Sequence, residues 1–236
     1  MAHLWKGSVL GAVAGIEGGA PSVAVYDDSA DQKLFYNGER PVPAGLFAAL
    51  PALWNLSERV DSGELPAGEK LPSGRTFDET AAEIVSGSVE ALDSLMNFLG
   101  IENVNAAARR AGMTQTDIAV PAGSADAEKK NLTCAADAAA FFRKLSRGEG
   151  ISQDSRARLI RAFSSCPEKG KFAAPGVPVA HLAFSAAKSE YDAGIFFPGT
   201  DHPIAAAALV ILLTSREKGL AFCEKTARAL ASADEN

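Results

Sequence analysis

Serine followed three residues later by lysine is the first pattern in this chain that could do chemistry. It occurs at Ser185 and Lys188 and again at Ser215 and Lys218. When both residues share a helix face, the amine can take the hydroxyl proton, and the serine can then attack an ester, amide or lactam carbonyl. Here the first serine falls in a predicted turn between strands and the second at the start of the last predicted helix. We therefore expect both patterns to be chance matches, and of the two we regard Ser185 and Lys188 as the stronger candidates for a nucleophile and its base.

His181 is a candidate general base, because an imidazole titrates near pH ~6.5. It lies on a predicted strand, where a structural histidine is the more frequent finding. No Asp or Glu can be identified from the sequence as its orienting partner, so no Ser-His-Asp triad can be assembled. The histidines and the three cysteines do not follow the spacing of a metal site, and we expect no metal and no cofactor. The odd number of cysteines predicts free thiols in a reducing compartment.

The composition is that of an ordinary globular protein, with 47% hydrophobic and 22% charged residues and a net charge of −6. Its basic residues are scattered, which argues against nucleic acid as a partner. The longest apolar stretch, Ile204 to Thr214, is about half of the roughly 20 residues that span a bilayer, so we expect no membrane partner. No secretory signal is visible, which favours a cytoplasmic protein. A trimmed signal would instead place it in the periplasm or outside the cell.

Strand patterns occur near both ends of the chain and helical patterns fill the middle. We predict one antiparallel sheet built from both ends, an α+β fold with an inserted helical lobe. The sheet lobe comprises residues 1–44 and 171–236 and the helical lobe residues 45–170, in one compact structural unit. Within the helical lobe a single long helix is expected from Asp78 to Leu99, ended by Gly100. Strands are predicted at Ser22–Asp27, Leu34–Gly38, Val177–Phe184, Tyr191–Phe197 and Ile204–Leu213.

Several short segments in this order resemble one enzyme family. They include Gly38-Glu-Arg-Pro-Val-Pro-Ala44, Phe98-Leu-Gly100, Asn131-Leu-Thr133 and Asp192-Ala-Gly-Ile195. Their order and spacing are similar to those of the class A β-lactamases and the wider penicillin-recognising serine hydrolases. The resemblance implies a five-stranded antiparallel sheet flanked by the terminal helices, with an all-α lobe beside it. It also implies a catalytic cleft between the two lobes.

The catalytic motifs of that family are degenerate here. Its Ser-x-x-Lys is matched by Gly45 to Ala48, which offer neither a hydroxyl nor an amine. Its Ser-Asp-Asn is matched by Ser86-Gly87-Ser88, which keeps the first serine, or by a register one residue later. Its Lys-Thr-Gly is matched by Leu182-Ala183-Phe184, and its omega-loop Glu pattern is missing from residues 117–130, although Glu128 is a carboxylate of the right type.

These departures favour a protein that has lost serine acyl-transfer chemistry. We expect its cleft either to bind a small molecule or peptide, or to be filled by apolar side chains such as Phe47 and Phe184. The alternative is a divergent serine hydrolase, acting on an ester, amide or β-lactam, that uses Ser86, Ser88 or Ser185. A third possibility is a scaffold for self-association, and the oligomeric state is left open.

Overall fold

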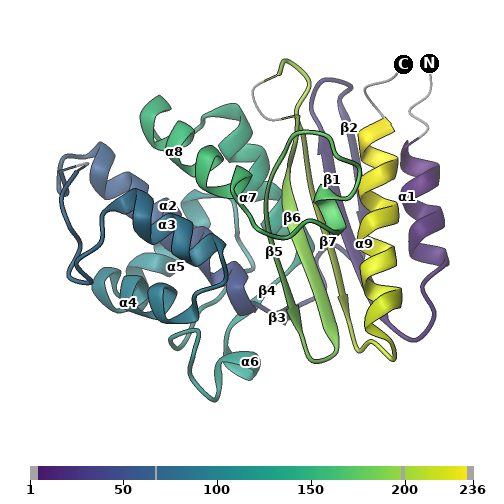
Figure 1. Cartoon of the computed structure of the whole chain (residues 1–236), viewed down its shortest axis with the longest axis horizontal. Helices are drawn as coiled ribbons and strands as arrows, with labels where there is room; N and C mark the ends of the chain where they lie inside the picture. The colour runs from purple at the N-terminus through teal and green to yellow at the C-terminus, as the bar shows by residue number, and fades with distance from the viewer. Residues whose placement is uncertain (1–4, 67, 198–199, 233–236) are drawn as a thin grey trace.

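The computed structural model describes residues 5–66, 68–197 and 200–232. Its centre is a five-stranded antiparallel sheet in the order β2-β1-β7-β6-β5 (Figure 1). The strands are β1 Ala20–Asp27, β2 Gln32–Tyr36, β5 Val179–Ala186, β6 Ser189–Phe196 and β7 Ile204–Ile211. Strand β1 from the N-terminal part pairs with β7 from the C-terminal part along eight residues, from Ala20 opposite Ile211 to Asp27 opposite Ile204. The predicted α+β fold, with one sheet built from both ends of the chain, is confirmed.

The two terminal helices cover one face of this sheet. Helices α1 (Trp5–Ala14) and α9 (Arg216–Ala231) lie side by side there (Figure 1). Trp5 and Phe222 pack into a core with alternate residues of β7, including Ala206 and Ala208. Because side chains alternate along a strand, the residues between them point to the opposite face. The sheet is therefore buried on both sides.

The helical lobe packs on that opposite face. It contains α2 (Ala49–Asp61), α3 (Phe77–Val85), α4 (Val89–Leu99), α5 (Ile101–Arg110), α7 (Ala135–Arg147) and α8 (Gln153–Ser164). Helix α7 lies against β1, β6 and β7 and joins the lobe to the sheet. A cluster of edge-to-face rings, Trp54, Phe141, Phe142 and Phe163, ties α2, α7 and α8 together. Within the described ranges, no helix is long and apolar enough to cross a membrane.

The prediction of one long helix from Asp78 to Leu99 is wrong. The chain leaves the helix after Val85 and starts a new one at Val89. Gly87 adopts a φ of +99°, a conformation that interrupts an α-helix and that glycine adopts without a steric penalty. The Ser88 hydroxyl then accepts a hydrogen bond from the Ala91 backbone N–H at 3.1 Å, which caps the second helix. The segment Ser86-Gly87-Ser88 is thus an elbow between α3 and α4, in which Ser86 and Gly87 are exposed and Ser88 is half-buried.

Two short elements fix the start of α2. Strand β3 (Val42–Pro43) pairs with β4 (Leu132–Thr133), and the Ala44 backbone N–H donates to the Asn131 carbonyl at 2.8 Å. Just before β4, α6 (Ala127–Lys130) forms a single helical turn. These contacts bring residues 122–131 alongside the start of α2.

Candidate functional site

The position expected to hold the family's nucleophile is occupied by a glycine under an aromatic ring. Gly45 opens a short 3₁₀ turn that runs into α2, and its φ is +50°. A Cβ built on Gly45 would lie 2.5 Å from Cε2 of Phe184, which is closer than two non-bonded carbon atoms approach one another. Ala48, at the lysine position, is fully buried. Moving the motif one residue along, to Leu46 and Ala49, also yields neither hydroxyl nor amine.

Three aromatic rings fill the corner where the two lobes meet. Phe184 stacks on Tyr191 with centroids 4.4 Å apart and planes 8° apart. Phe47 stands edge-on to both rings, at 5.3 and 5.8 Å. Leu182 is completely buried in the core between the sheet and the helical lobe. The segment Leu182-Ala183-Phe184 therefore contributes packing where a Lys-Thr-Gly motif would contribute a cation and a hydroxyl.

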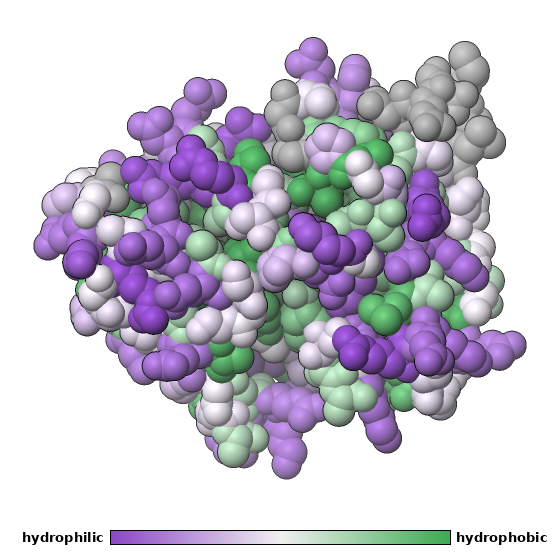
Figure 2. All heavy atoms as spheres, in the orientation of Figure 1, coloured by the Kyte–Doolittle hydropathy of each residue, from purple (hydrophilic) through white to green (hydrophobic). Residues whose placement is uncertain are grey.

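A cavity of about 300 Å³ lies directly beside these rings. Its walls come from the start of α2, from residues 122–131 and from the β5–β6 hairpin. They include Gly45, Glu128, Asn131, Phe184, Ser189 and Tyr191. Figure 2 shows apolar residues gathered between the helical lobe and the sheet, with polar residues around them. Burial raises the pKa of Tyr191 to about 12, Ser189 opposes this with a hydrogen bond, and the Glu128 charge adds to it. The cavity thus combines an aromatic floor with one carboxylate.

The serines of the α3–α4 elbow are not paired with a base. The Ser88 hydroxyl oxygen accepts the hydrogen bond that caps α4. Ser86 is exposed, and no hydrogen bond of its hydroxyl is found among the described residues. A serine needs a base within hydrogen-bonding reach to become a nucleophile.

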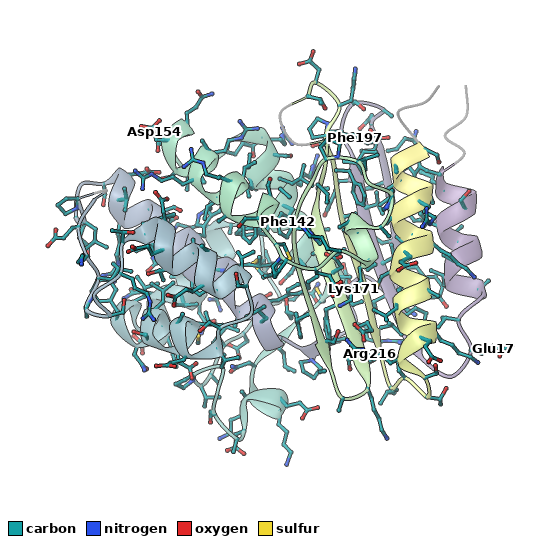
Figure 3. The ribbon with its side chains drawn as sticks, in the orientation of Figure 1. Glu17, Phe142, Asp154, Lys171, Phe197 and Arg216 are labelled. Carbon is teal, nitrogen blue, oxygen red and sulfur yellow. The ribbon has the colours of Figure 1, made fainter. Side chains whose placement is uncertain are left out.

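Ser185 does meet a lysine, but not the expected one. Its hydroxyl donates to Glu190 Oε2 at 2.5 Å and accepts from Lys171 Nζ at 3.3 Å. Lys171 is fully buried, and its ammonium is 2.8 Å from the same Glu190 carboxylate. Arg216 closes the cluster by donating to Glu190 Oε1 at 3.0 Å. Figure 3 shows Lys171 and, below it, Arg216 at the start of α9. The Ser185 hydroxyl donates to Glu190 and not to Lys171, so this lysine is not placed to take the hydroxyl proton. Among the described contacts, none joins Ser185 to the side chain of Lys188.

His181 has the acidic partner that could not be identified from the sequence. Its Nδ1 is 2.9 Å from Asp192 Oδ1, and both side chains are buried. Asp192 also accepts the Phe172 backbone N–H at 2.9 Å. Burial lowers the pKa of His181, but the Asp192 carboxylate outweighs it and raises the pKa to about 10. The register explains the pairing. His181 lies opposite Gly194, so Asp192, two residues away, is its diagonal neighbour on the same face.

A third residue completes this group. Cys166 acts on the imidazole as well and adds to its raised pKa. Cys166 follows α8 and is 15 residues before His181 in the sequence, in a segment without a strand or helix pattern. No sequence signal marks it. All three cysteines are free thiols, as predicted. No cluster suited to a metal ion occurs among the residues that the structure describes.

Comparison with known proteins agrees with this architecture. A family model described as the beta-lactamase enzyme family matches residues 80–233. Among solved structures, the chain is similar to a β-lactamase from Sphaerobacter thermophilus DSM 20745, with a TM-score of 0.84, 18% identity and coverage of 98% of this chain and 96% of that one. PBP-A gives a TM-score of 0.84 and 19% identity, over 100% and 97% of the two chains. A β-lactamase from Burkholderia vietnamiensis gives 0.84 and 17%, over 98% and 97%.

A search of curated proteins found no match. The structural likeness at these identities is a likeness of fold, while the family model spans more than half of the sequence. It includes the α3–α4 elbow, the β5–β6 hairpin and the helix that closes the sheet. The chain therefore belongs to the beta-lactamase enzyme family.

Proposed function

We propose that this member of the family forms no acyl-serine at the usual position and instead binds a small ligand in the cavity between its lobes. The observation that carries the proposal is the contact of Phe184 with Gly45. The ring occupies the space that the side chain of a nucleophile would need. Without a serine and a lysine on the first turn of the central helix, the acyl-transfer step has neither its nucleophile nor its base.

The walls of the cavity suggest the polarity of its ligand. Phe184 and Tyr191 offer ring surface, and Glu128 is the only charged side chain among the lining residues. A β-lactam carries a carboxylate, which the Glu128 charge would repel. A ligand with an apolar or aromatic body and a neutral or cationic group fits this lining better.

The loss of acylation is tested by incubating the chain with a fluorescent penicillin and measuring its intact mass. We expect no covalent adduct. A penicilloyl group mapped to any serine would overturn the proposal, whichever serine carried it.

The binding function is tested with three ligands that share one ring: benzylamine, benzyl alcohol and benzoate. Ligand-detected NMR should show the amine binding most tightly and benzoate most weakly. Glu128→Gln should weaken the amine by about two- to fivefold, the size expected for one solvent-exposed charge pair. Glu102→Gln, an exposed glutamate on α5 that does not line the cavity, is the matched control. Equal binding of all three ligands, or none of any, would contradict the proposed site.

A further inference from the structure

A buried lysine lies behind the hairpin whose rings form the floor of the cavity between the lobes. Lys171 opens a short 3₁₀ turn, η2 (Lys171–Ala173), and its side chain is completely enclosed. Its φ is +51°, a left-handed conformation that is unfavourable for a residue with a side chain. A charged group is rarely buried unless several partners satisfy it. Both features indicate that contacts around Lys171 hold it in place.

The Lys171 ammonium donates to the backbone of the two residues that carry the stacked rings. Its Nζ is 2.9 Å from the carbonyl oxygen of Phe184 and 3.3 Å from that of Tyr191. These two residues lie directly opposite each other in the β5–β6 ladder, and their ring centroids are 4.4 Å apart. One buried cation therefore bridges both strands at the position of the stacked pair.

Lys171 reaches the hairpin from the face that is turned away from the cavity. Ser185 and Glu190 form the next cross-strand pair after Phe184 and Tyr191, and successive side chains of a strand point to opposite faces. The Lys171 ammonium contacts both of these side chains, 3.3 Å from Ser185 Oγ and 2.8 Å from Glu190 Oε2. Turn η2 and α9 pack on this face. The cation and the rings thus lie on opposite sides of the same hairpin.

A second cation binds the same carboxylate and provides an internal comparison. Arg216 donates to Glu190 Oε1 at 3.0 Å and to Ser185 Oγ at 3.2 Å. Its side chain is 69% exposed, and its contacts within the described part of the chain include neither hairpin carbonyl. Arg216 therefore shares the electrostatic role of Lys171 toward Glu190 but not its contact with the backbone of the cavity floor.

We propose that Lys171 is a positioning residue for the cavity between the lobes. By holding the carbonyls of Phe184 and Tyr191 from behind, it keeps their rings stacked and keeps Phe184 over Gly45. Without the ammonium, both buried carbonyls lose this donor, and the hairpin should shift to satisfy them. The effect on ligand affinity rests on the function proposed above, whereas the position of the rings is a property of the chain without ligand.

The test compares Lys171→Met, alone and with Glu190→Gln, with the matched control Arg216→Met. Urea denaturation measures stability, and NMR of Gly45 measures the ring position. A Cβ built on Gly45 would meet the Phe184 ring, so the hydrogen in its place points at that ring and senses its ring current. Phe184→Leu gives the chemical shift of Gly45 without the ring. We expect Lys171→Met to move Gly45 more than halfway to that value and Arg216→Met to leave it unchanged.

The double variant separates positioning from stability. Glu190→Gln removes the buried carboxylate that Lys171→Met leaves short of a partner, so stability should recover in part. The two carbonyls still lack their donor, so Gly45 should stay shifted. A Gly45 signal that returns together with stability, or that moves as far in Arg216→Met, would overturn the proposal. The unchanged chain provides a test that needs no variant to fold: scalar coupling across the hydrogen bonds from Lys171 ¹⁵Nζ to the two carbonyl carbons is expected, and its absence would refute the contact.

Benzylamine links the ring position to the proposed function. The double variant should bind it at least about threefold more weakly than Arg216→Met, because a floor that is no longer fixed must be ordered on binding. Equal affinity of the two variants would contradict the role of Lys171 in positioning the site. If the unchanged chain bound no benzylamine, only the proposed function would fail, and the Gly45 signal would still decide whether Lys171 positions the rings.

Discussion

Replacing Gly45 by serine should destabilise the chain more than its backbone conformation alone explains. A non-glycine residue at a φ of +50° costs about 1–2 kcal/mol. The new Cβ would also lie 2.5 and 2.6 Å from two atoms of the Phe184 ring, and overpacking of this kind costs about 1–3 kcal/mol. We therefore expect Gly45→Ser to lower the free energy of unfolding by about 2–5 kcal/mol, measured by urea denaturation.

A second glycine separates the two causes. Gly63 has a φ of +76°, and a Cβ there would meet nothing within 4 Å. Gly63→Ser should cost only the backbone part, about 1–2 kcal/mol. Removing the ring with Phe184→Ala should relieve the clash, so the double variant with Gly45→Ser should be more stable than the two single effects predict by at least about 1 kcal/mol. Equal costs at Gly45 and Gly63, together with an additive double variant, would refute the idea that Phe184 closes the nucleophile position.

Three further outcomes concern ionised groups. Lys171→Met should lower the free energy of unfolding by about 3–5 kcal/mol, since it leaves the buried Glu190 short of a partner, and adding Glu190→Gln should recover part of the loss in the same denaturation assay. The pKa of Asp61 is lowered because hydrogen bonds from Ser152 and Ser155 outweigh its burial, so the stability it supplies is present above pH ~4 and lost on acidification below that. Asp61→Asn should therefore destabilise the chain at pH 7 and much less at pH 3; an equal cost at both would refute this role. The pKa of His181 is raised, so its contribution is complete below pH ~6.5 and is lost as the pH rises through about 10. The melting temperature should therefore fall as the pH rises toward about 10. Asp192→Asn should make this fall with pH shallower, and an unchanged slope would contradict the pairing of His181 with Asp192.

The sequence was sufficient for the architecture because the hydrophobic pattern alternates in the strands and repeats helically in the middle. It was insufficient for the break at Gly87, since a lone glycine between apolar turns is compatible with a continuous helix. Only the structure shows that Ser88 starts a new helix there. The short pairing of β3 with β4 was also missed, because two residues are too few to show a period.

The candidate site was predicted less completely than the fold. Phe47 and Phe184 were expected at the cleft from the resemblance and from residue type, and in the structure their rings meet edge to face with centroids 5.3 Å apart. It could not pair His181 with Asp192, because that contact depends on the register of the β5–β6 hairpin. It gave no indication of Cys166, whose approach to His181 depends on how the segment after α8 follows the sheet edge. The functional roles of Ser86, Ser88, Ser185 and Lys188 stay predictions.

The contact between Gly45 and Phe184 also bears on how this chain could change over generations. A serine at position 45 meets the ring, and a smaller residue at position 184 alone brings no nucleophile. A lysine at Ala48 would place an amine in a completely buried position. Installing either of these residues therefore costs stability before it can bring any benefit. A chain with this packing would therefore gain a new activity more readily at another surface than at position 45.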